Sequence, residues 1–96
     1  MKYHDITIHK KQEFYSLTDM WKAQKSPDTK RPYDWMKLEQ TKELLSEWEK
    51  QVGGSPTWTQ HGGKFRGSYG SKHIALSYAA YLSVEFHVWM LKVVEE

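Results

Sequence analysis

Apolar and polar residues alternate from Tyr3 to His9, and this pattern predicts a half-buried strand because successive strand side chains point to opposite faces. Ile6 and Ile8 fall on one side of that strand. The link 10–13 contains no glycine or proline, so we expect a loop longer than a two-residue turn. A second short strand should follow at Phe14 and Tyr15.

The apolar spacing then changes to that of helices. Ser16 stands three residues before Asp19, which predicts a capped helix start, and the helix should run from Ser16 to Gln24. Ser26-Pro27-Asp28 should end it. After a basic elbow at Lys30-Arg31-Pro32, Trp35 and Met36 indicate a separate helical turn.

The clearest helical pattern extends from Leu38 to Val52. Its apolar positions recur every three or four residues, and Gly53-Gly54 should end the helix. The predicted buried stripe consists of Leu38, Thr41, Leu45, Trp48 and Val52, with Leu44 beside it.

A β-hairpin is predicted between Thr57 and Tyr69, where β-branched and aromatic residues flank Gly62-Gly63. By alternation, the return strand should present Lys64, Arg66 and Ser68 to solvent. Phe65 and Tyr69 should then face the core.

Two helices should complete the chain, one capped by Ser71 and one capped by Ser83. The first should bury Ile74, Ala75, Tyr78, Ala79 and Leu82. The second should bury Phe86, Trp89, Met90 and Val93. Strands, a helix pair, a hairpin and two final helices predict an α+β fold.

Composition limits what such a chain can be. Its 96 residues suffice for one domain, and 39% hydrophobic and 15% aromatic residues suffice for a small core. There is no cysteine, which excludes disulfides and thiol chemistry. No apolar run approaches the roughly 18 residues of a membrane span, so we expect a soluble intracellular protein. Val93-Val94-Glu95-Glu96 still has helical character, and we expect the chain to be the N-terminal part of a longer protein.

Charge is distributed unevenly along the chain. Residues 1–38 and 53–73 each carry a net charge of +3, whereas residues 39–52 and 74–96 each carry −2. A fold that brings the two basic segments together would create a positive face on a nearly neutral domain, as small nucleic-acid-binding proteins often do. A mixed, solvated surface is the alternative.

Catalytic and metal-binding patterns are missing. The five histidines share no ligand spacing, and Glu39, Glu43 and Glu47 form a row on the polar face of a helix. No nucleophile motif surrounds any serine, and the glycines do not form a phosphate loop. We therefore expect neither an enzyme, nor a metal site, nor a cofactor.

Several motifs, in order, resemble the KilA-N domain of bacteriophage and large DNA virus proteins. In the second half of the chain, the stretch from His61 to Tyr69 is similar to that family's glycine-aromatic hairpin. Tyr78-Ala79-Ala80-Tyr81-Leu82-Ser83-Val84-Glu85-Phe86 is similar to its helix junction. In the first half, Phe14-Tyr15-Ser16-Leu17-Thr18-Asp19-Met20 and Arg31-Pro32-Tyr33-Asp34-Trp35-Met36-Lys37 match the family's helix start and its Arg-Pro-x-x-Trp segment.

This resemblance implies a winged helix-turn-helix-like domain, similar to the APSES domain of fungal transcription factors. Its hairpin, Thr57 to Tyr69, would be the wing. The resemblance further implies a phage or prophage regulator, antirepressor-like, in the cytoplasm of a bacterial host. Its partner would be double-stranded DNA, bound with or without sequence preference. The implied DNA-binding residues are Lys30, Arg31, Lys37, Gln40, Thr41, Lys42, Lys64, Arg66 and Ser68.

Physical chemistry adds one expectation to the resemblance. Glutamates along the helix after Leu38 would be repelled by phosphates, whereas its N-terminal end offers free amides and Lys37, so we expect an end-on approach to DNA. Four or five phosphate contacts should make affinity fall steeply with salt. Specificity would require Arg66 or Gln40 at base edges.

Two other functions remain open. A module that binds a repressor or host protein would need an exposed apolar patch, for which Trp21, Trp58 and Tyr81 are the candidates. An RNA-binding or single-strand-binding protein would need exposed aromatics such as Tyr69 or Trp58 to stack on bases. A homodimer would strengthen DNA binding by a small domain.

Overall fold

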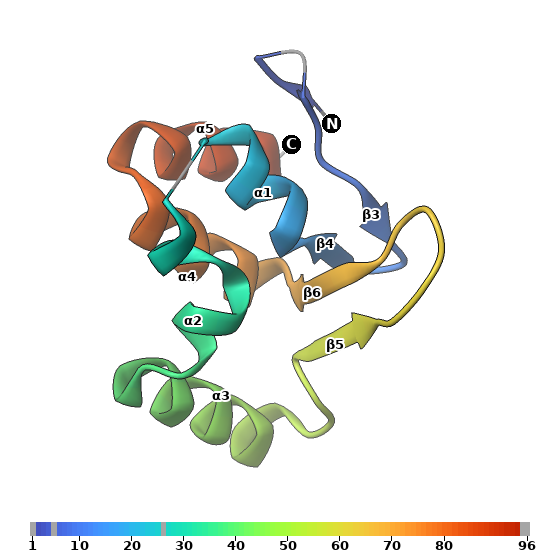
Figure 1. The fold of residues 1–96 in the computed structure, drawn as a ribbon. Helices are drawn as coiled ribbons and strands as arrows, with labels where there is room; N and C mark the ends of the chain where they lie inside the picture. The colour runs from blue at the N-terminus through green and yellow to red at the C-terminus, as the bar shows by residue number, and fades with distance from the viewer. Residues whose placement is uncertain (1, 5, 26, 95–96) are drawn as a thin grey trace.

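Four short antiparallel strands form one sheet along one side of the molecule, in the order β3-β4-β6-β5 (Figure 1). The computed structural model describes residues 2–4, 6–25 and 27–94. The strands are β3 (Lys10–Lys11), β4 (Phe14–Ser16), β5 (Thr57–Gln60) and β6 (Gly67–Ser71). Since β4 pairs with β6, with Tyr15 opposite Gly70, the hairpin β5–β6 is joined edge to edge with the N-terminal strands rather than standing free.

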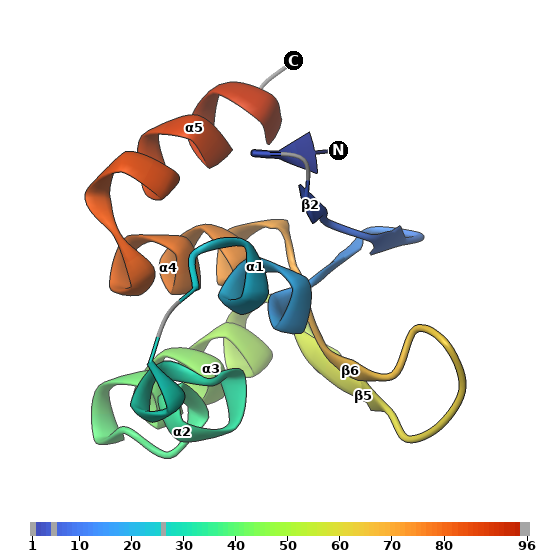
Figure 2. The ribbon, with the colours of Figure 1, turned by 45° about the horizontal axis from the view of Figure 1, so that its top comes forward.

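The helices lie on the other side of the molecule from the hairpin loop (Figure 1). They are α1 (Leu17–Ala23), the 3-10 turn η1 (Asp28–Lys30), α2 (Pro32–Met36), α3 (Glu39–Val52), α4 (Lys72–Leu82) and α5 (Val84–Val94). Helix α4 lies in the middle and packs against α1, α5, β4 and β6. The fully buried core residues include Leu17, Met20, Ile74, Tyr78, Phe86 and Met90. Figure 2 shows α5 along one edge of the molecule, beside the N-terminal strands.

Several predictions that rest on short-range signals are confirmed, and the fold is α+β. The Asp19 amide donates to Ser16 Oγ at 3.1 Å, so Ser16 caps α1. Pro32 is the first residue of α2, and Gly53, with φ of 84°, follows the end of α3. The buried residues predicted for α4 are all buried: Ile74, Ala75, Tyr78, Ala79 and Leu82. Of those predicted for α5, Phe86 and Met90 are buried, and Trp89 and Val93 are half-buried.

The N-terminal segment differs from the single strand predicted over Tyr3 to His9. Strand β1 (Lys2–Tyr3) pairs antiparallel with β2 (Ile6–Thr7), and His4 has φ of 47° where the chain reverses. Ile8 is fully buried whereas Ile6 is 39% exposed, so the two do not share a buried face. The reversal allows the Tyr3 ring to pack against Phe86 and Trp89 of α5, a long-range contact that alternation does not reveal. Asp5 lies outside the described residues.

The prediction of a longer loop at 10–13 is also wrong. Lys11 pairs with Phe14, so only Gln12 and Glu13 connect β3 to β4. Gln12 adopts a positive φ of 54°. In such a turn this backbone conformation is usually found at glycine or asparagine. Helix α1 ends at Ala23, before the predicted stop; Ser26 lies outside the described residues, as do Glu95 and Glu96 at the C-terminus.

The hairpin and α3 also depart from their patterns. The return strand begins only at Gly67, so Lys64, Phe65 and Arg66 belong to a loop, and Phe65 is 36% exposed instead of facing the core. Alternation does not apply to these residues because they are not in a strand. In α3 only Thr41 is buried, while Leu38 and Val52 at its two ends are exposed, because this helix lies at the periphery.

Candidate nucleic-acid interface

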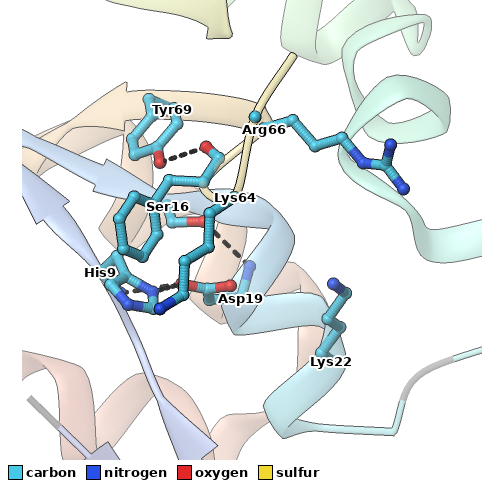
Figure 3. Close-up of a pocket in the computed structure, with 9 residues that line it drawn as sticks. His9, Ser16, Asp19, Lys22, Lys64, Arg66 and Tyr69 are labelled. Carbon is cyan, nitrogen blue, oxygen red and sulfur yellow. Dashed lines mark hydrogen bonds and ion pairs between the residues drawn. The ribbon is translucent and has the colours of Figure 1, made fainter. Parts of the chain in front are cut away.

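A hollow of about 480 Å³ separates the hairpin loop, residues 61–66, from the start of α1 (Figure 3). Side chains from three segments line it: the N-terminal strands, α1 and the hairpin. The lining residues are His9, Ser16, Asp19, Lys22, Gly63, Lys64, Phe65, Arg66 and Tyr69. One wall of the hollow is therefore formed by the hairpin that the sequence predicts as a wing.

Hydrogen bonds hold the hairpin in place at the edge of this hollow. The Ser68 amide donates to Thr18 Oγ1 on α1 at 3.0 Å, and the Tyr69 hydroxyl donates to the Phe65 carbonyl at 2.7 Å. Burial, and secondarily the nearby Asp19 carboxylate, raises the pKa of Tyr69. Tyr69 therefore keeps the proton that it donates to the loop.

His9 and Asp19 form the floor of the hollow. His9 Nδ1 lies 2.6 Å from Asp19 Oδ2, and the His9 amide donates to the same oxygen at 2.8 Å. The Phe65 ring lies against the His9 ring, with centroids 4.4 Å apart. Sequence reasoning missed this pair, because the alternation of Tyr3 to His9 gave no sign that His9 turns toward α1.

Three exposed cations surround the floor. Figure 3 shows Lys64 extending down toward the His9–Asp19 pair, whereas Arg66 points away from it and Lys22 rises from α1. None of the three forms an ion pair with another described residue. Since three cations line the hollow against the single carboxylate of Asp19, the hollow presents a surplus of positive charge. Lys22 was not predicted, although its position one helical turn after Asp19 could have indicated it.

The remaining predicted DNA-binding residues lie elsewhere. The start of α3 and the hairpin loop are at opposite sides of the molecule in both views (Figures 1 and 2). The predicted DNA-binding residues are thus divided between two regions of the surface. Ser68 is half-buried at the start of β6, beside the hollow.

Two cations of the second region are engaged within the chain. Lys30 Nζ donates to the Tyr81 carbonyl at 3.3 Å, and Arg31 Nε donates to Asp34 Oδ2 at 3.0 Å. Lys37, by contrast, is exposed and lies 4.2 Å from the centroid of the Tyr33 ring.

The residues that follow at the start of α3 divide by exposure. Gln40 and Lys42 are exposed, but Thr41 is only 3% exposed and packs inward. Thr41 therefore offers no surface to a duplex.

The aromatic residues on which a protein-interaction surface would depend are half-buried. Trp21 Nε1 donates to the Pro27 carbonyl at 3.0 Å, and Trp58 stacks on Tyr69 with centroids 4.5 Å apart. Tyr81 is covered by Lys30. These three side chains do not form the exposed apolar patch that a protein-binding alternative requires.

Residues 2–4, 6–25 and 27–94 contain no group of three or more side chains able to hold a metal ion. No helix in these ranges has the length and apolar character needed to cross a membrane.

A small α+β domain with unpaired cations around a hairpin loop has the character of a module that contacts a polyanion. The family model of the KilA-N domain matches residues 1–96, and the chain therefore belongs to the KilA-N domain family. This is a family of DNA-binding domains, which supports DNA binding in general. No curated protein and no solved structure gives a significant match to the chain.

Proposed function

We propose that the chain binds double-stranded DNA through the hairpin loop and α1, with Lys22, Lys64 and Arg66 contacting phosphates. The observation that carries this proposal is the arrangement of these three exposed cations around one hollow, in a chain of a DNA-binding family. The hairpin loop protrudes from the sheet, so it can straddle a backbone or enter a groove (Figure 2). Gly62 and Gly63 at its tip carry no side chains that would hold the backbone away from a phosphate.

Lys37, Gln40 and Lys42 at the start of α3 form a second contact region in this proposal. Glu43 and Glu47 are exposed further along α3, so a duplex would meet the beginning of this helix and be repelled by its body. Lys30 and Arg31 contribute less, because each already has a partner within the chain.

The biological role that we propose is regulatory, in a bacteriophage or prophage and antirepressor-like, and it requires no catalysis and no cofactor. Family membership supports this role. Binding would be largely tolerant of sequence, since phosphate contacts position a protein without reading bases.

The test is fluorescence anisotropy with a labelled random duplex across a salt series. The logarithm of affinity should fall with the logarithm of salt concentration, and each phosphate contact should contribute about 0.9 to the slope. Lys64→Ala, Arg66→Ala and Lys22→Ala should each flatten the slope by about one contact. Lys2→Ala removes an exposed lysine of β1 that does not line the hollow, and it is the matched control.

Three results would decide against the proposal or refine it. Equal slopes for the wild type and the three loop and α1 variants would exclude the hairpin loop as the contact. An absence of binding at low salt would favour the repressor or host-protein alternative. Preference for a single-stranded competitor would favour base stacking over duplex binding. Lys37→Ala and Lys42→Ala, measured alongside, show whether the second region takes part.

A further inference from the structure

Helix α5 has one apolar face that the described part of the chain does not cover. Its inner face is buried through Phe86 and Met90 against α4 and the N-terminal strands. On the outer face, Val84 is 77% exposed and Val88 is 45% exposed. Leu91, half-buried, continues the same row because residues four and then three positions apart align along a helix. In Figure 2 this helix lies along an edge of the molecule away from the hairpin loop.

Charges at both ends of this apolar row indicate what could cover it. Glu85 in the first turn and Lys92 in the last turn are exposed and lie seven residues, or about two turns, apart on the same side of the row. If a second α5 packs antiparallel, Glu85 of each copy faces Lys92 of the other. A parallel pair would instead place like charges together.

We propose that two copies of this chain associate through α5, with the helices antiparallel about a two-fold axis near Val88. Val84, Val88 and Leu91 of each copy form the apolar seam, and two Glu85–Lys92 pairs flank it. An isologous contact of this kind is self-complementary and closes on itself as a dimer. The inference does not depend on DNA binding, because α5 contains none of the proposed DNA contacts.

The seam is short, so the dimer should be weak. Three apolar residues per copy cover much less than the roughly 1,200 Å² that stable interfaces bury, and we expect a dissociation constant on the order of 100 μM. Two copies that each contact one duplex would associate more fully, because the duplex raises their effective concentration.

Sedimentation velocity without DNA, from about 10 μM to about 1 mM protein, tests the proposal around the expected dissociation constant. The wild type should shift from monomer to dimer across this range. Glu85→Lys and Lys92→Glu should each weaken association about tenfold, because both cross-pairs become repulsive. The double variant Glu85→Lys/Lys92→Glu should recover to within about threefold of the wild type, because it restores both pairs in reverse.

Two further variants separate the seam from general surface effects. Val88→Lys should abolish association, whereas Val52→Lys, at a valine of α3 that is 62% exposed against 45% for Val88, should leave it unchanged. Because Glu85 also accepts a hydrogen bond from Tyr3, circular dichroism should confirm that each variant is folded. Any of three results would overturn the proposal: a wild type that stays monomeric up to about 1 mM, a Val88→Lys variant that associates as the wild type does, or a double variant that associates no more tightly than the single variants.

Discussion

The start of β6 approaches α1 so closely that no side chain fits between them. A Cβ on Gly67 would lie 2.5 Å from Thr18 Oγ1 and 2.9 Å from Thr18 Cβ. The backbone of Gly67 also has φ of 139°, which residues other than glycine rarely adopt. Since the neighbouring Ser68 amide bonds to the same hydroxyl, this contact fixes the hairpin, with Lys64 and Arg66, relative to Lys22.

Gly67→Ala should therefore lower the free energy of unfolding by about 2 kcal/mol or more, through both the clash and the backbone strain. Urea denaturation measures this change. Gly62→Ala is the matched control in the same hairpin, because a Cβ there meets nothing within 4 Å. We expect the control to change stability by less than about 0.5 kcal/mol. Equal urea midpoints for the two variants would show that the hairpin shifts without cost and does not depend on Gly67.

At the scale of elements, the two C-terminal helices begin at serines that look alike in the sequence but differ in the structure. Ser83 Oγ accepts from the Phe86 amide at 3.0 Å and donates to Gln24 Oε1 at 2.8 Å, so it caps α5 and ties that helix to the end of α1. Ser71 occupies the same position before α4, yet its hydroxyl makes no capping bond. That oxygen is buried and has no hydrogen-bond partner among the described residues.

This difference predicts that replacing each serine by alanine changes stability differently. Ser83→Ala should reduce stability by about 1 kcal/mol, a typical loss for a helix cap. That corresponds to a Tm lower by roughly 4–8 °C for a domain of this size. Ser71→Ala should leave Tm unchanged or raise it, because it removes a buried polar group without a partner. Thermal unfolding of both variants decides the matter, and a loss at Ser71 as large as at Ser83 would mean that its hydroxyl is satisfied.

The elements that could be predicted from the sequence are those whose cause is local. The cap at Ser16 and the apolar row of α4 arise from residues three or four positions apart, and both are confirmed. The reversal between β1 and β2 could not be predicted, because it depends on the Tyr3 ring packing against α5, more than eighty residues away. For the same reason the alternation rule misplaced Phe65, which packs against His9 instead of the core.

In the candidate site, too, residues indicated by a local motif were predicted, and those that depend on long-range contacts were missed. Lys64 and Arg66 were predicted from a hairpin motif, and both line the hollow. Lys22 and the His9–Asp19 pair were missed, because only the folded chain brings α1 and the N-terminal strands to the hairpin loop. The two basic segments meet in part: Lys22 of the first lies beside Lys64 and Arg66 of the second at the hollow. The start of α3 lies on the opposite side of the molecule from the hairpin loop (Figures 1 and 2).

At the scale of the whole molecule, α3 lies at the periphery, and aromatic contacts help to attach α2 and α3 to α4 (Figure 1). The Tyr78 hydroxyl donates to the Lys30 carbonyl, and the Tyr78 ring packs against Trp35 with centroids 5.0 Å apart. Trp48 of α3 packs against His73 of α4 at 5.1 Å. Tyr78 is fully buried, so the attachment of α2 depends on a phenol that must remain protonated.

Burial, with smaller effects from Tyr81 and Asp34, raises the pKa of Tyr78 above its ordinary value of 10.0. Above about pH 10 the unfolded chain therefore releases a proton that the folded chain retains, and the free energy of unfolding falls as pH rises. The contribution of this one group approaches about 1.4 kcal/mol per pH unit. Tyr69, whose pKa is also raised, acts in the same direction.

Tyr78→Phe should accordingly lower stability at pH 7 by about 1 kcal/mol, because the bond to Lys30 is lost. The same variant should lose less stability than the wild type between pH 10 and pH 11.5, so the two curves converge in alkali. Urea midpoints across that range measure the effect, with Tyr33→Phe as the control because Tyr33 is 63% exposed. Parallel curves for the wild type and Tyr78→Phe would show that Tyr78 does not limit alkaline stability. Convergence accompanied by faster amide exchange in α3 of the wild type would locate the first alkaline opening at the attachment of α2 and α3.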